Sequence, residues 1–111
     1  YFENRFAGRC RYVVKPTLGR EGGGITVCDP DGAVVARDRE KYYWDQTMVY
    51  QQYVELEEAE LETLAGPRRG RLVWGSFLVG GEPAAVVARL GDLITDDLAF
   101  FVPVCLAEGR R

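Results

Sequence analysis

Two turn sequences place much of the chain in antiparallel hairpins. The first, Asp29-Pro30-Asp31-Gly32, has Asp, Pro and Gly where a type I turn prefers them, and it separates the β-branched runs 25–28 and 33–37. The second, Gly80-Gly81-Glu82-Pro83, separates the apolar runs 72–79 and 84–90. The arms of this second hairpin are apolar at consecutive positions, so we expect both of its faces to be covered.

The remaining segments predict one more strand and one or two short helices. Residues 48–54 are aromatic and β-branched, which favours a strand. Residues 55–64 are strong helix formers before Gly66-Pro67 and predict a short acidic helix, although an ordered, charged loop fits the same composition. Thr95 or Asp96 could cap a single helical turn. We therefore expect an α+β fold dominated by antiparallel sheet, in one domain spanning residues 1–111.

Length and charge exclude several classes of partner. The chain has 111 residues, of which 47% are hydrophobic, enough for one modest core. A formal net charge of -3 provides no basic field that would attract nucleic acid. The apolar runs are too short to span a bilayer, so we expect neither nucleic-acid nor membrane partners.

Cysteine and histidine usage narrows the chemistry further. Cys10, Cys28 and Cys105 lie far apart without a CxxC spacing, which indicates free thiols in a reducing cytoplasm rather than a zinc site or a disulfide framework. The chain has no histidine, so Ser-His and Cys-His mechanisms cannot be assembled within it. It begins at Tyr1 without Met and shows no targeting segment, and it therefore reads as part of a longer protein.

A glycine-rich loop is the main candidate for a binding site. The run 12–14, Tyr-Val-Val, leads into Lys15-Pro16-Thr17-Leu18-Gly19-Arg20-Glu21-Gly22-Gly23-Gly24. Glycines permit positive φ and close approach, and a lysine at the entrance favours an anion such as phosphate. The order of a P-loop is absent. A glycine loop that joins two antiparallel strands can instead act as a flap over a triphosphate, although it can also be a simple flexible turn.

Two charged clusters have plainer interpretations. Arg68, Arg69 and Arg71 follow the acidic segment and are most simply its counter-charges. Asp96-Asp97 would fit a metal or acid-base site, but a helix N-cap and its neighbour explain the pair as well. We therefore assign no metal ligands within the chain.

Four separated stretches resemble the glutathionylspermidine synthase family of ATP-grasp ligases. YVVKPTLGREGGGITV is similar to that family's YVKKP-x-x-x-REGANI, and residues 49–52, VYQQ, resemble its IYQ strand. WGSFLVGGEPA, residues 74–84, resembles its GSW-x-VGGEPAG hairpin. Arg89 with residues 93–95, LIT, and 101–103, FVP, resembles its R-x-x-x-x-LIT…RFVP closing segment. The matches are collinear from residue 1 to about residue 106.

The resemblance implies a C-terminal, nucleotide-binding part of an ATP-grasp domain in a cytoplasmic carboxylate–amine ligase. Such an enzyme uses ATP and Mg²⁺ to convert a carboxylate into an acyl phosphate, which an amine then displaces to form an amide. The acid would be glutathione-like and the amine polyamine-like. The family's magnesium ligands precede the matching region, so we expect the metal ligands outside this chain and the chain alone to be inactive.

Site residues follow from the matching positions. Lys15 would contact the ATP phosphates, and Arg89 would neutralise the acyl phosphate as the catalytic residue. The loop over the phosphates comprises Gly19, Arg20, Glu21, Gly22, Gly23 and Gly24, and the adenine edge would be held by Gln51, Gln52 and the backbone of Tyr53 and Val54.

Each assignment has a structural alternative. Lys15 could be an ordinary strand-end lysine, and Arg89 could be a charge that protects a sheet edge. Gln51 and Gln52 could satisfy each other and the sheet, and Arg20 could pair with Glu21 on the surface.

The sequence departs from the family pattern in two places. The family's RFVPH ends here as Phe100-Phe101-Val102-Pro103-Val104, without the basic residue and the histidine, and the segment between Tyr50 and Trp74 is longer and more acidic.

The alternative function is a noncatalytic binding or interaction domain that retains the scaffold. Apolar faces and a sheet edge left open in this chain would also favour self-association.

Overall fold

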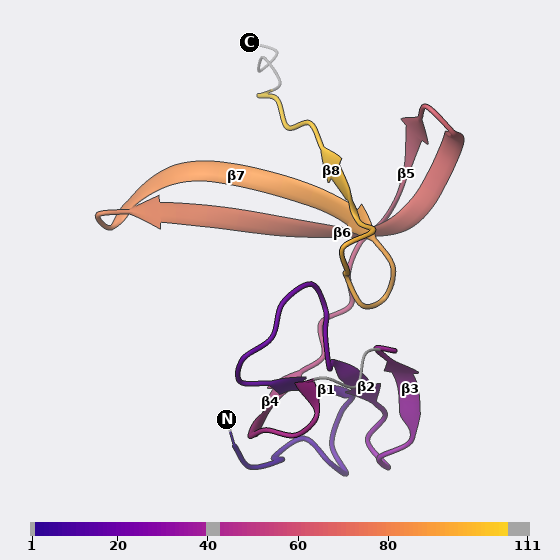
Figure 1. Cartoon of the computed structure of the whole chain (residues 1–111), viewed down its shortest axis with the longest axis vertical. Coiled ribbons are helices and arrows are strands. Elements are labelled where there is room, and N and C mark those ends of the chain that lie inside the picture. Colours follow the sequence, from indigo (N-terminus) through magenta and orange to yellow (C-terminus); the bar gives the residue numbers. More distant parts are fainter. Residues whose placement is uncertain (1, 40–42, 107–111) are drawn as a thin grey trace. The chain divides into compact units, whose positions relative to one another are not determined.

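The computed structural model describes residues 2–39 and 43–106. The chain divides into two compact units, one formed by Tyr1–Glu55 with Leu93–Asp97 and the other by Leu56–Asp92 with Leu98–Arg111. Each unit is built on one four-stranded antiparallel sheet (Figure 1). Among the described residues, no helix has the length and apolarity needed to cross a bilayer.

The first unit carries the strands β1 (Tyr12–Pro16), β2 (Thr26–Cys28), β3 (Val34–Arg37) and β4 (Met48–Gln52). Their order in the sheet is β3-β2-β1-β4, so the chain returns from β3 to the far side of β1. The turn between β2 and β3 confirms the first predicted hairpin, since the Gly32 amide donates to the Asp29 carbonyl at 2.9 Å and Gly32 has a φ of 88°. The predicted strand at 48–54 is confirmed over Met48–Gln52 as β4, and it ends before Tyr53.

The core of the first unit lies along β1 and β2. Tyr12, Val27 and Cys28 are buried, and so is the hydroxyl residue Thr26. The rings of Tyr12 and Tyr50 pack at a centroid distance of 6.3 Å across β1 and β4. This core holds the two strands that enter and leave the glycine-rich segment.

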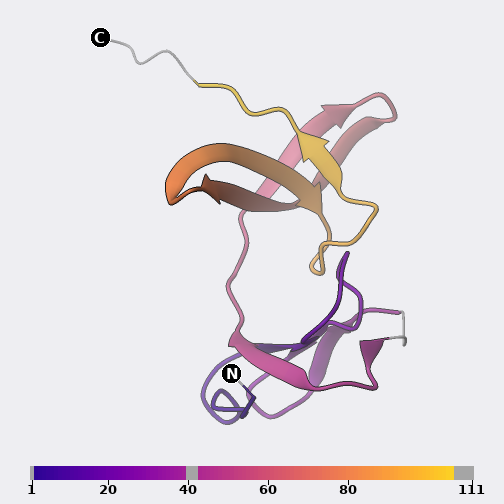
Figure 2. The same ribbon diagram turned by 60° about the vertical axis from the view of Figure 1, so that its left-hand side comes forward.

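The second unit carries β5 (Glu58–Thr63), β6 (Gly66–Val79), β7 (Glu82–Gly91) and β8 (Phe100–Val102), in that spatial order. β6 and β7 form a long curved hairpin with β5 and β8 on its outer sides (Figure 2). The predicted hairpin is confirmed, and its two-residue turn has φ values of 59° at Gly80 and 87° at Gly81, as a type I′ turn requires.

The expected α+β fold is wrong, because the described residues form strands and no α-helix. The acidic segment predicted as a helix contains β5, and no helical turn follows Thr95. In β5, the glutamates at 58, 60 and 62 are exposed and alternate with less exposed residues at 59, 61 and 63. This period of two matches a half-buried strand, and pairing with β6 overrides the intrinsic helix propensity.

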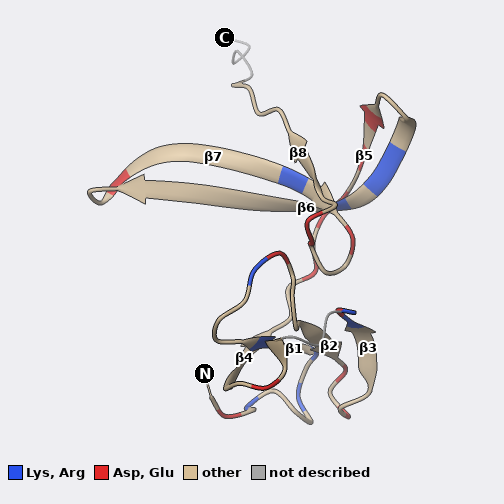
Figure 3. Ribbon diagram, viewed as in Figure 1, with Lys and Arg blue, Asp and Glu red and all other residues tan. Residues whose placement is uncertain are grey.

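Arginines on β6 supply the charges opposite β5. The register pairs Glu60 with Arg69 and Glu58 with Arg71, and the Glu58 carboxylate accepts hydrogen bonds from Arg69 at 2.6 and 3.1 Å. Figure 3 shows the basic part of β6 facing β5, while most of the β6–β7 hairpin carries no charge. The interpretation of these arginines as local counter-charges is confirmed for Arg69 and Arg71.

Much of the apolar surface of the β6–β7 hairpin is open in this chain. Ala88 and Leu90 are buried near the middle of the sheet, but Trp74, Phe77, Leu78, Val79 and Val86 are between 53% and 70% exposed. The expectation that both faces of this hairpin are covered is therefore wrong within the described residues. The outer half of the hairpin has no packing partner there.

Candidate functional site

The glycine loop, defined here as residues 17–25, connects β1 to its antiparallel neighbour β2. It contains two consecutive tight turns. In the first, the Gly23 amide donates to the Arg20 carbonyl at 2.8 Å, and both central residues, Glu21 at 54° and Gly22 at 78°, have the positive φ of a type I′ turn. In the second, the Ile25 amide donates to the Gly22 carbonyl at 3.2 Å.

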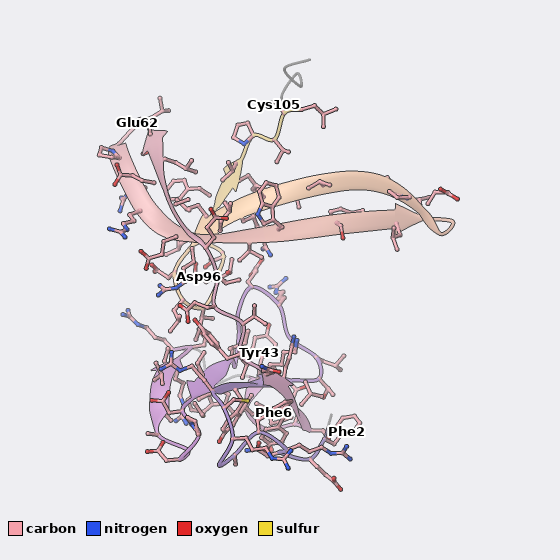
Figure 4. All side chains as sticks on the ribbon, turned by 180° about the vertical axis from the view of Figure 1, so that it is seen from behind. Phe2, Phe6, Tyr43, Glu62, Asp96 and Cys105 are labelled. Carbon is pink, nitrogen blue, oxygen red and sulfur yellow. The ribbon has the colours of Figure 1, made fainter. Side chains whose placement is uncertain are left out.

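Close packing explains why glycines occupy the second half of the loop. A β-carbon on Gly22 would lie 2.7 Å from the carbonyl oxygen of Thr95, and one on Gly24 would lie 2.8 Å from Cβ of Tyr43. A β-carbon on Gly23 would overlap the Tyr43 ring, whose place within the first unit is shown in Figure 4. Tyr43 and the segment Leu93–Asp97 therefore confine the loop.

Lys15 lies at the entrance to the loop and contacts one of the predicted glutamines. Its Nζ donates to Oε1 of Gln51 at 2.7 Å, across the β1–β4 pair. The partner is a neutral amide, and Lys15 takes part in no ion pair within the described part of the chain. The ammonium is thus oriented by a neutral partner and is left without an ion-pair partner among those residues.

A hollow of about 180 Å³ lies beside Lys15 and is lined by the loop. Its walls are Lys15, Pro16, Gly19, Arg20, Glu21, Gly22, Gly23 and Ile25. Arg20 and Glu21 are 3.8 Å apart here, so the surface pair considered from the sequence is present but loose. The structure brings Lys15, Gln51 and the predicted loop residues together at one place.

The backbone amides of residues 19–25 divide into two groups. The amides of Gly23, Gly24 and Ile25 are satisfied by the Arg20 carbonyl, the Asp38 carboxylate and the Gly22 carbonyl. The amides of residues 19–22 have no acceptor among the described residues. Unsatisfied amides beside an uncompensated ammonium can bind an anion.

The residues predicted to hold adenine are only partly available for that role. Gln51 accepts from Lys15, and the Tyr53 amide donates to the Arg11 carbonyl at 3.0 Å. The Arg11 guanidinium also lies 5.5 Å from the centroid of the Tyr53 ring. Gln52 and Val54 are exposed. The Tyr53 backbone therefore keeps only its carbonyl for a ligand.

Arg11 is fixed by an acidic turn residue next to this position. Its Nε donates to Oδ1 of Asp29 at 2.8 Å. This hydrogen bond and the Asp29 charge raise the pKa of Arg11 above its ordinary value, so the guanidinium stays protonated.

Arg89 belongs to the second unit. It lies on β7, paired with Val73 of β6 and Phe101 of β8, and is half-buried. It is therefore not on a free sheet edge, which removes the alternative considered from the sequence. Its predicted catalytic role stays a prediction.

Two anchors of the loop escaped the sequence interpretation. Gln46 forms hydrogen bonds with both backbone groups of Leu18, and Asp38 accepts from the Gly24 amide. Neither residue lies in a motif, and a polar residue at a strand end is too common to indicate a contact. Among the described residues, no three His, Cys, Asp or Glu side chains gather where they could hold a metal ion.

Comparison with known proteins identifies the family. A family model described as glutathionylspermidine synthase preATP-grasp matches residues 1–107. Among curated proteins there is no match. The resemblance to glutathionylspermidine synthase is thus confirmed, but its position is corrected, because the matching model describes the preATP-grasp part and not a C-terminal nucleotide-binding portion. The chain belongs to the glutathionylspermidine synthase preATP-grasp family and is related to a ligase.

Proposed function

We propose that the first unit binds the phosphate groups of ATP in a carboxylate–amine ligase that forms an amide through an acyl phosphate. In this proposal the Lys15 ammonium neutralises phosphate charge, and the amides of residues 19–22 donate hydrogen bonds to phosphate oxygens. The family relation to a ligase supports the reaction class. A glutathione-like acid, a polyamine-like amine and a cytoplasmic parent enzyme belong to the same proposal.

The observation that carries the proposal is the pairing of Lys15 with Gln51 at the mouth of the loop. A carboxylate partner would cancel the charge of the ammonium, whereas the Gln51 amide only directs it. Charge-assisted hydrogen bonds are about twice as strong as neutral ones, so an oriented, uncompensated ammonium is well suited to a phosphate. The hollow beside it is lined by both Lys15 and the loop, so an anion placed there would contact both.

For the adenine edge of the nucleotide, we propose the predicted groups that have no hydrogen-bond partner among the described residues. Gln52 and the backbone of Val54 are proposed for the adenine edge, together with the Tyr53 carbonyl. Gln51 would act on the phosphates through Lys15 rather than on the base. Arg89 is proposed to neutralise the acyl phosphate, as the family resemblance implies.

The described residues do not fit a dedicated magnesium site, since no acidic cluster suited to a metal occurs among them. The proposal therefore uses no protein-bound metal at this loop. We propose that Mg²⁺ is held by the nucleotide and by parts of a longer ligase, and that this chain alone does not catalyse amide formation.

Titration of the chain with ATP, with and without Mg²⁺, tests the proposal. Isothermal calorimetry should show binding, and Lys15→Ala should raise the Kd at least about tenfold, which corresponds to roughly 1.4 kcal/mol. Arg9→Ala is the matched control, because Arg9 is exposed in the same unit and its removal changes the net charge equally. Equal losses in both variants, or none, would refute a specific role for Lys15.

Absence of ATP binding would favour the second candidate, a noncatalytic interaction domain. The exposed apolar residues of the β6–β7 hairpin favour that candidate, since such surface commonly marks a contact with another protein.

A further inference from the structure

Gln46 holds the entrance of the glycine loop by both of its polar atoms. Its Oε1 accepts from the Leu18 amide at 2.9 Å, and its Nε2 donates to the Leu18 carbonyl at 2.8 Å. A side-chain amide offers the same donor and acceptor as a strand backbone. Gln46 therefore extends the pairing of β1 with β4 by one residue beyond the Thr17 amide, which donates to the Thr47 carbonyl at 3.0 Å.

Leu18 has no other hydrogen bond among the described residues. Its side chain is 78% exposed, so packing cannot determine the direction of the chain at this point. The next residue, Gly19, begins the run of amides that have no acceptor in the described part of the chain. The two hydrogen bonds between Gln46 and Leu18 thus set the direction in which the chain enters that run, while packing against Thr95 and Tyr43 confines its far end.

Asp38 holds the exit of the loop in a similar way. Its Oδ2 accepts from the Gly24 amide at 2.9 Å, and its own amide donates to the Ile25 carbonyl at 2.9 Å. A carboxylate acceptor makes the first of these bonds charge-assisted and strong. Asp38 follows β3 and Gln46 precedes β4, so the two anchors come from the two ends of one connection.

We infer that Gln46 and Asp38 are positioning residues that hold the glycine loop in its phosphate-binding conformation, an inference that rests on the proposed function. Neither lines the hollow, so each acts through the loop backbone. A loop held in its binding geometry loses less conformational freedom when the ligand arrives. If an anchor is removed, only a fraction of molecules keeps the competent loop, and the apparent Kd rises by the inverse of that fraction.

The test measures loop order and ATP affinity in the same variants of the 111-residue chain. Gln46→Leu removes both hydrogen bonds to Leu18, together with a longer one that Gln46 accepts from the Thr17 hydroxyl at 3.4 Å, at nearly constant size. Thr47→Val is the control, because it leaves the Thr47 carbonyl in place. Hydrogen exchange followed by NMR reports the Leu18 amide directly. We expect Gln46→Leu to accelerate exchange of Leu18 and to raise the Kd for ATP about fivefold, with Thr47→Val unchanged in both.

The Asp38 variants provide a second, independent arm. Asp38→Ala should weaken ATP binding, and Asp38→Asn, which keeps an acceptor oxygen, should restore most of it. This rescue keeps the inference testable should Gln46→Leu fail to fold. Faster Leu18 exchange with an unchanged Kd would overturn the positioning role of Gln46, and equal affinities in the two Asp38 variants would overturn that of Asp38.

Failure of the inference and failure of the proposed function give different results. If the unmodified chain does not bind ATP, the proposed function fails and the positioning role fails with it. If the unmodified chain binds ATP and Lys15→Ala weakens it, while Gln46→Leu binds normally, only the positioning role is overturned.

Discussion

The ring of Tyr43 packs directly on Gly23, where a β-carbon would overlap the ring atoms Cδ2 and Cε2. Gly23 has no positive φ, so the need for glycine here comes from space rather than from backbone conformation. The glycine loop is thus held against the body of the first unit and is not merely a flexible turn.

Gly23→Ala should destabilise the first unit because the new methyl group must displace the Tyr43 ring. Overpacking of this kind costs about 1–3 kcal/mol, which urea denaturation monitored by fluorescence can measure. Tyr43→Ala should therefore destabilise the Gly23→Ala variant less than it destabilises the unmodified chain. Strict additivity of the two changes would contradict the packing explanation.

Gly22→Ala and Glu21→Gly should have different effects on the stability of the first unit. Gly22→Ala meets both a φ of 78° and the Thr95 carbonyl, and should destabilise by at least about 1–2 kcal/mol. Glu21→Gly relieves the left-handed strain of a non-glycine residue at 54°, offset by the added freedom of glycine when unfolded. Thermal unfolding should therefore show a clear loss for Gly22→Ala and a shift near zero or upward for Glu21→Gly.

Glu58 should contribute modestly and in a salt-dependent way to the second unit. Its pairs with Arg69 and Arg71 are partly exposed, so Glu58→Ala should cost no more than about 1 kcal/mol at low ionic strength. The difference should shrink in about 1 M salt, where the Debye length is near 3 Å. Glu60→Ala is the control, since no ion pair of Glu60 is found among the described residues. A larger, salt-independent loss at Glu58 would point to packing instead.

The β6–β7 hairpin should drive self-association of the isolated chain. Phe77, Leu78 and Val79 are exposed next to each other near its tip. Replacing Phe77 and Leu78 with Ser should reduce the average mass measured by analytical ultracentrifugation at high protein concentration. Leu64→Ser is the control, because Leu64 is exposed in the turn between β5 and β6, away from the hairpin tip. Equal masses for all variants would exclude the hairpin as the contact.

The sequence allowed the local elements to be predicted where turn chemistry and strand pattern agreed. The turns at Asp29–Gly32 and Gly80–Gly81 identified both hairpins, because glycine and proline restrict the backbone locally. Between residues 55 and 64 composition and pattern disagreed, and the helix prediction followed composition. The alternation of Glu58, Glu60 and Glu62 with less polar residues was the better signal, because a strand buries one face only.

The candidate site also combines features that the sequence predicts with contacts that only the tertiary structure shows. The sequence by itself determined which segment carries the lysine and the glycines and that the chain resembles a ligase family, because residue types and their order are local information. Only the tertiary structure decided that Gln51 orients Lys15, that Gln46 and Asp38 hold the ends of the loop, and that Tyr43 confines it. These contacts join residues far apart along the chain. The pairing of β1 with β4, which no turn between the two strands specifies, places Gln51 beside Lys15 and Gln46 beside the start of the loop.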